Sequence, residues 1–170
     1  SAANRVRFLV FHHGPTVAAV LAVLGVALLA GAAWVLATPP TDTVSERVDV
    51  QTVGADSELP LKEVSGDSLE LAIEMVPEGA RQFGVKVCAS PDGQEETLVY
   101  YDANDKKLKI DTDKSSLGQG PKSIEGGPFE LKPDEPLKLR VYVDKSVVEV
   151  FANDRQAVMR RIYPTRKDSV

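Results

Sequence analysis

The chain has 170 residues, of which 43% are hydrophobic, 26% are charged and 6% are aromatic. This length favours one domain of ordinary size, and a formal net charge of −5 argues against a nucleic-acid-binding protein, which normally presents a basic face. A single cysteine, Cys88, excludes an intramolecular disulfide, and two histidines, His12 and His13, leave almost no means for histidine-based acid–base or metal chemistry. We therefore expect no cofactor, no bound metal and no nucleic-acid partner.

The N-terminal part of the chain differs sharply in composition from the rest. No Asp, Glu, Lys or Arg occurs from Phe8 to Thr41, and Val17 to Ala37 is an apolar run of 21 residues. At a rise of 1.5 Å per residue, a helix of this length spans about 30 Å, the thickness of the hydrocarbon core of a bilayer. The run predicts one N-terminal transmembrane helix over residues 17–37, through which the chain would contact the membrane.

The charges around this run predict its orientation. Arginines precede it and acidic residues follow it, so the positive-inside rule places residues 1–16 in the cytoplasm and the remainder outside. A signal peptide is the first alternative, because Val35 and Ala37 are small residues at the −3 and −1 positions of a cleavage site, and the protein would then be secreted. A buried core helix is the second alternative.

The run is followed by a segment of different character. Pro39 and Pro40 end any helix, because proline has no N–H group to continue it. Residues 38–60 are predicted to form a linker or stalk with some strand character, since valines alternate with polar residues in the first half of this segment. Residues 61–170 are the expected folded domain, which would be truncated if another strand began at Val170.

From residue 61 onward the apolar residues recur with a period of two, which is typical of half-buried strands. Strands are predicted over residues 69–75, 83–89, 97–101, 108–111, 137–143, 147–152 and 157–163. Residues 115–128, which are rich in glycine, proline and serine, predict a long surface loop. About seven short strands without any helical period indicate an all-β fold, an antiparallel two-sheet β-sandwich of the jelly-roll or lectin-like type.

Residues 137–152 predict a β-hairpin at the centre of this sandwich. A two-residue turn at 145–146 places Val143 opposite Val148 in the core. It also places Tyr142 opposite Glu149, with both side chains on the other face of the sheet.

The run from Leu139 to Ala157, LRVYVDKSVVEVFANDRQA, closely resembles the C-terminal β-sandwich of glycoside hydrolase family 32, which includes invertases, levanases and inulinases. The resemblance extends upstream through FGVKV at 83–87 and SPDG at 90–93, and it covers residues 61–168. It does not reach the N-terminal segment. The resemblance implies a module of an enzyme that acts on sucrose or fructan.

Enzymes of that family carry their nucleophile in Asn-Asp-Pro-Asn, a transition-state stabiliser in Arg-Asp-Pro and an acid/base in Glu-Cys, all within a five-bladed propeller. Asn-Asp occurs here at 104–105 and 153–154 without a following proline, and neither Arg-Asp-Pro nor Glu-Cys occurs. We therefore assign no catalytic residue and expect the chain to be inactive alone.

The resemblance implies a non-catalytic accessory module, membrane-anchored and extracytoplasmic, whose partner is a catalytic β-propeller in cis or in trans. A cell-surface module that binds fructan polysaccharide is one alternative. A structural envelope domain that binds no sugar is the other.

One surface cluster suits a sugar, since saccharides stack on exposed aromatic rings and charged groups bind their hydroxyls. Arg140, Tyr142 and Glu149 are the predicted sugar-contacting residues. Arg140 lies diagonal to Glu149 in the predicted hairpin, so that we also expect these two to form a structural cross-strand ion pair. Cys88 is expected to share the outward face with Lys86 and to have no role as a nucleophile.

Overall fold

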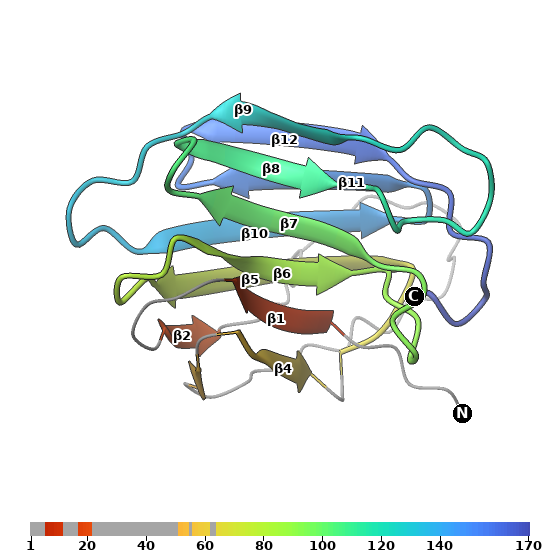
Figure 1. The fold of residues 1–170 in the computed structure, drawn as a ribbon, viewed down its shortest axis with the longest axis horizontal. Helices are drawn as coiled ribbons and strands as arrows, with labels where there is room; N and C mark the ends of the chain where they lie inside the picture. The colour runs from red at the N-terminus through yellow and green to blue at the C-terminus, as the bar shows by residue number, and fades with distance from the viewer. Residues whose placement is uncertain (1–5, 12–16, 22–50, 55, 62–63) are drawn as a thin grey trace, which may run out of the picture.

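The computed structural model describes residues 6–11, 17–21, 51–54, 56–61 and 64–170. Their strands form two six-stranded sheets that pack face to face, with the core between them (Figure 1). Every strand pairing in both sheets is antiparallel. The prediction of an all-β, two-sheet antiparallel fold is confirmed.

The first sheet has the strand order β4-β1-β6-β7-β8-β9. Its strands are β4 (Glu58–Leu61), β1 (Val6–Phe11), β6 (Gln82–Val87), β7 (Thr97–Asp102), β8 (Lys107–Asp111) and β9 (Ile124–Pro128). The second sheet has the order β12-β11-β10-β5-β2-β3. Its strands are β12 (Gln156–Arg161), β11 (Val147–Ala152), β10 (Leu137–Asp144), β5 (Ser68–Val76), β2 (Val17–Leu21) and β3 (Gln51–Val53).

The core is built from alternate side chains of the two facing sheets. Strand β10 shows the pattern clearly, since every second residue from Leu137 to Val143 is buried and those between are more exposed. The largest fully buried apolar side chains are Phe83, Leu71, Met75, Leu108, Ile110, Leu137, Leu139 and Ile162. Burial of these apolar side chains between the two sheets is the main source of stability for such a fold.

The β10–β11 hairpin has the predicted register. Val143 faces Val148 and Tyr142 faces Glu149 across the strand pair. The turn is made by Lys145 and its neighbour at 146, and the φ angle of Lys145 is 51°, as tight hairpin turns require.

Strand β9 corrects the prediction of one long loop over 115–128. Its residues look like a loop because they include Gly126 and Gly127, but both glycines serve close packing. A Cβ atom on Gly126 would lie 2.3 Å from the carbonyl oxygen of Leu108, and one on Gly127 would lie 2.1 Å from Nε2 of Gln156. Gly126 therefore lets this edge strand approach the backbone of β8 closely, and Gly127 leaves room for the flexible Gln156 side chain of β12.

Strand β2 corrects the prediction of a helix that begins at Val17. Val17–Leu21 pairs with β5 on one side and with β3 on the other. A short apolar run fits a buried strand as well as a helix, and only pairing with distant strands decides between them. Residues 22–37 of the predicted span lie outside the described residues. Within the described part of the chain, no helix has the length and hydropathy needed to cross a membrane.

The described end of the predicted linker 38–60 also contributes strands. Strand β3 pairs with β2 in the second sheet, and β4 pairs with β1 in the first. Val53 and Leu61 are both buried in the core. The sandwich therefore includes residues before position 61.

Candidate binding site

The outer face of the second sheet carries polar and aromatic side chains. Because β10 buries its odd-numbered residues, Arg140 and Tyr142 lie on the opposite face. Tyr142 lies between Glu70 on β5 and Glu149 on β11, and Arg140 lies beside Phe151 of β11. The structure thus brings together the three residues that the sequence predicts for sugar contact; that contact itself stays a prediction.

The predicted ion pair between Arg140 and Glu149 is wrong. Arg140 Nη2 instead donates to Glu70 Oε1 at 2.9 Å, and the Tyr142 hydroxyl donates to the same oxygen at 3.0 Å. Glu70 comes from β5, which flanks β10 on the side away from β11. The hairpin alone offers Glu149 as the only acidic neighbour, so the sequence pattern could not identify the competing carboxylate.

The rings of this face form a small cluster. Tyr142 and Phe151 pack edge to face with their centroids 6.0 Å apart, and the Arg140 guanidinium lies 5.9 Å from the centroid of the Tyr142 ring. Burial raises the pKa of Tyr142, and its hydrogen bond to Glu70 acts in the same direction. The Tyr142 hydroxyl is thus a neutral donor at ordinary pH.

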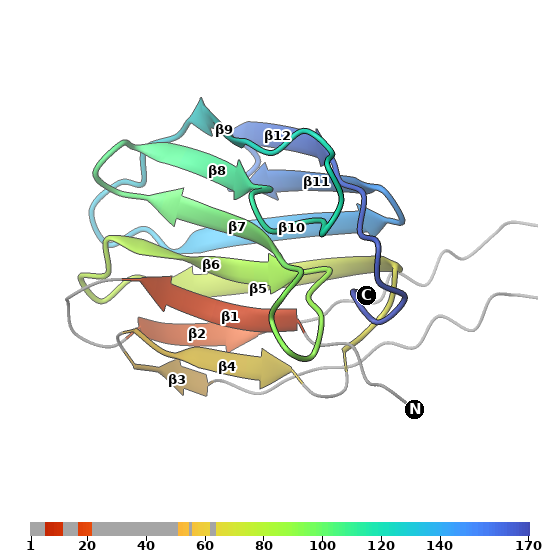
Figure 2. The ribbon, with the colours of Figure 1, turned by 45° about the vertical axis from the view of Figure 1, so that its right-hand side comes forward.

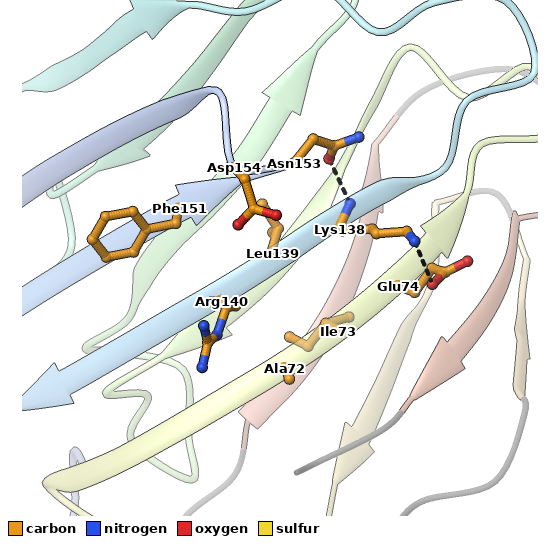
Figure 3. A pocket seen from close by; sticks show the side chains of 9 residues that line it. All are labelled: Ala72, Ile73, Glu74, Lys138, Leu139, Arg140, Phe151, Asn153 and Asp154. Carbon is orange, nitrogen blue, oxygen red and sulfur yellow. Dashed lines mark hydrogen bonds and ion pairs between the residues drawn. The ribbon is translucent and has the colours of Figure 1, made fainter. Parts of the chain in front are cut away.

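Beside this cluster the face is hollowed into a shallow pocket of about 230 Å³ (Figure 3). The pocket is lined by Ala72, Ile73, Glu74, Lys138, Leu139, Arg140, Phe151, Asn153 and Asp154. Figure 3 shows the Phe151 ring and the Asp154 carboxylate on the β11 side and the Lys138–Glu74 ion pair towards β5. Among the charged residues of the lining, only Arg140 is a sugar-contacting residue predicted from the sequence.

The turn after β11 positions Asp154 at the rim of this pocket. Asn153 and Asp154 both have positive φ angles, 48° and 54°, which asparagine and aspartate tolerate better than most residues. The Asn153 side chain fixes the turn, since its Oδ1 accepts from the backbone N–H of Lys138 at 2.7 Å and its Nδ2 donates to the carbonyl oxygen of Pro136 at 2.9 Å. Two sequence features indicate this rim. One is the turn-forming Asn-Asp pair at 153–154, and the other is the position of Phe151 on the outward-facing side of the alternating strand.

The buried carboxylate of Glu95 has a structural role that no sequence pattern indicates. Its Oε1 accepts from the backbone N–H groups of Leu117 at 2.8 Å and Thr165 at 3.0 Å, and also from the Thr165 hydroxyl. Its Oε2 accepts from the Arg166 N–H at 3.1 Å and from the Ser169 hydroxyl at 2.6 Å. The carboxylate thus joins a surface loop and the C-terminal segment to the β6–β7 loop, beside which that segment lies in Figure 2.

Glu95 is 0% exposed, and burial alone raises the pKa of a carboxyl group. Hydrogen bonds from Ser169, Thr165 and Leu117 outweigh burial and lower the pKa of Glu95 to about 2. The group is therefore ionised at neutral pH although no cationic side chain bonds to it among the described contacts.

Residues 39–170 match the family model described as "Glycosyl hydrolases family 32 C terminal". The chain belongs to this family. The resemblance inferred from the run at 139–157 is confirmed.

Relatives and a solved structure agree with this membership. The chain is 30% identical over 132 residues to a sucrose-6-phosphate hydrolase of Zymomonas mobilis, which covers 74% of the chain and 25% of that protein. It is 34% identical over 122 residues to a levanase of Bacillus subtilis, covering 68% of the chain and 18% of that protein. An exo-inulinase from Aspergillus awamori matches with a TM-score of 0.57 and 26% identity over 62% of the chain and 21% of that structure. The chain thus spans about a quarter or less of the proteins it matches.

Cys88 departs from its predicted place within this family 32 module. It is only 5% exposed and belongs to the core, and its φ of 49° departs from strand geometry directly after β6 ends. Burial raises its pKa to about 12, so the thiol stays protonated. Lys86, expected beside it, instead forms an ion pair with Glu96 at 2.9 Å. Among the described residues, no cluster of three or more His, Cys, Asp or Glu side chains is suited to a metal ion.

Proposed function

We propose that this chain is a non-catalytic accessory module of a sucrose- or fructan-active glycoside hydrolase, and that its partner is the catalytic β-propeller of such an enzyme in cis or in trans. The observation that carries the proposal is the family match over residues 39–170, which corresponds to a quarter or less of each relative. The C-terminal domain of family 32 enzymes normally pairs with a catalytic domain.

The non-catalytic part of the proposal is supported by the sequence. A retaining glycosidase needs a carboxylate nucleophile and a second carboxyl group as acid/base, about 5–5.5 Å apart. The family's motifs for these groups are absent, and Asp105 and Asp154, the acids of the two Asn-Asp pairs, are followed by Lys106 and Arg155 where the family has proline.

The purified chain alone is expected to release no reducing sugar from sucrose, inulin or levan, because it supplies no nucleophile for a glycosyl-enzyme intermediate. The measurement is a reducing-sugar assay over many hours at high protein concentration. Activity that persists through a second, independent purification would overturn the non-catalytic assignment.

Pairing with a catalytic domain is tested by complementation. The Zymomonas mobilis sucrose-6-phosphate hydrolase is truncated before the segment that matches this chain and is then expressed with or without the full chain. We expect the chain to co-purify with the truncated enzyme and to restore part of its activity, whereas a chain carrying Val143→Asp should do neither. Failure of the intact chain to associate with any family 32 propeller tested would contradict the accessory role.

Extracytoplasmic location and membrane attachment stay predictions, based on the charge and hydropathy of the N-terminal segment. Val17–Leu21 is part of β2, so these residues cannot lie in the sheet and in a bilayer at the same time. In cells that express the full chain, added protease is expected to degrade residues 64–170 without lysis. Degradation only after lysis would place the domain in the cytoplasm.

A further inference from the structure

We propose that the hollow over β5, β10 and β11 is a binding site for a neutral oligosaccharide that contains fructose. This is a second property beyond pairing with a catalytic domain. The choice of fructose among neutral sugars rests on the proposed function, whereas the site itself is argued from its geometry and charge.

The hollow offers polar groups that the described fold does not use. The exposed Asp154 carboxylate makes no hydrogen bond or ion pair with the described residues. Arg140 is 52% exposed and bonds to Glu70 through Nη2, so that within the described contacts its Nε and Nη1 groups remain available as donors. A strong acceptor and a strong donor therefore face one cavity, and a hydroxyl group can bond to both because it donates and accepts.

The charges around the hollow balance. Its lining has two cations, Lys138 and Arg140, and two anions, Glu74 and Asp154. A phosphorylated ligand would favour a clear excess of cations, whereas a neutral polyol needs donors and acceptors in similar number. The lining thus fits an uncharged saccharide better than a sugar phosphate.

An aromatic ring borders the same hollow. Phe151 is half-buried, and its cross-strand neighbour on β12 is Ala157, whose methyl group covers little of a ring. Ala72, which lies opposite Arg140 on β5, is the small side chain that leaves the hollow open. Sugar rings place their C–H groups against such an apolar surface while their hydroxyl groups bond at the rim.

The size of the hollow suits a small ligand. A volume of about 230 Å³ is somewhat below the 300–1,000 Å³ typical of pockets for drug-sized ligands, and it suits one or two sugar units. A shallow, partly open site that holds one or two units of an oligosaccharide predicts weak binding.

The test is an NMR titration of the full chain with 1-kestotriose, a fructose-containing trisaccharide, beside maltotriose and fructose 6-phosphate. We expect 1-kestotriose to shift the amide signals of residues 138–140 and 151–154. Phe151→Leu should weaken binding about tenfold by removing the ring. Asp154→Asn, in an exposed turn that asparagine tolerates, should weaken it about fivefold by removing the charge. Ile124→Ala is the matched control, because it removes an apolar side chain that is 50% exposed on β9 of the other sheet.

Binding that both site variants weaken and the control leaves within about twofold would support the proposal. It would be overturned if the shifts fell on another surface, if folded Asp154→Asn bound like the natural chain, or if maltotriose or fructose 6-phosphate bound at least as tightly. Absence of any shift at saturating trisaccharide would also overturn it. None of these results depends on the complementation experiment, so failure of the site and failure of the accessory role remain distinguishable.

Discussion

Replacing Val143 with aspartate is expected to unfold the domain. Val143 is 3% exposed and lies in the second sheet between Leu69 of β5 and Val148 of β11. A carboxylate at this position would be buried without a partner, which costs several kcal/mol. A domain of this size has only about 5–15 kcal/mol of stability in total, so one such change removes most of it. Thermal unfolding followed by circular dichroism measures the effect.

Lys145→Ala is the matched control for this experiment. Lys145 is in the turn of the same hairpin, its side chain is 74% exposed, and its amine lies 3.6 Å from a carboxylate oxygen of Asp67. Surface ion pairs of this kind contribute little, and we expect a change of at most about 0.5 kcal/mol. A stable Val143→Asp protein together with a strongly destabilised Lys145→Ala protein would contradict the register of the hairpin.

Replacing Glu95 with glutamine is expected to cost about 3 kcal/mol at neutral pH, because the pKa of Glu95 lies at about 2 in the fold against an ordinary value of 4.5. Glutamine keeps the shape but presents an NH₂ group to donors that now bond to a carboxylate. The same donors then lack an acceptor in a buried site. Urea unfolding of the two proteins at pH 7 measures the difference.

The same pKa shift predicts a pH dependence. A carboxyl group with a lowered pKa in the fold stabilises it fully above its unfolded pKa, and this contribution disappears as the pH falls through the folded pKa. For Glu95 the loss extends from about pH 4.5 down to about pH 2. We expect Glu95→Gln to flatten the stability profile in this range, so that the two proteins become similar near pH 2.

Glu130→Gln serves as the control for charge removal, since Glu130 is 63% exposed and pairs only with exposed Lys106 in the described structure. It should leave both the stability at pH 7 and the acid profile nearly unchanged. If Glu95→Gln behaved like Glu130→Gln, the Glu95 carboxylate would not hold the C-terminal segment as the geometry indicates.

The candidate site was predictable only in part from sequence. The alternation of apolar and polar residues predicts that the Tyr142 side chain faces outward, and the short turn predicts that it lies opposite Glu149. The structure confirms both predictions. The partner of Arg140 does not follow, because Glu70 is 70 residues away along the chain and meets Arg140 only through the pairing of β5 with β10. The pocket beside them likewise depends on Ala72 of β5.

Local chemistry in the sequence determined the strands from β5 onward, except β9, and the β10–β11 hairpin, because period-two burial and turn residues act between near neighbours. The tertiary structure alone decided where the ambiguous segments belong. Val17–Leu21 is apolar enough for a helix, and 124–128 is glycine-rich enough for a loop, yet both form strands because backbone N–H and C=O groups of distant strands pair with them. The contacts of the Glu95 carboxylate are likewise decided by the tertiary structure, since the groups at 117 and 165–169 that donate hydrogen bonds to it lie 22 to 74 residues away along the chain. Contacts at that separation leave no period in a sequence, and they exist only once the two sheets have closed.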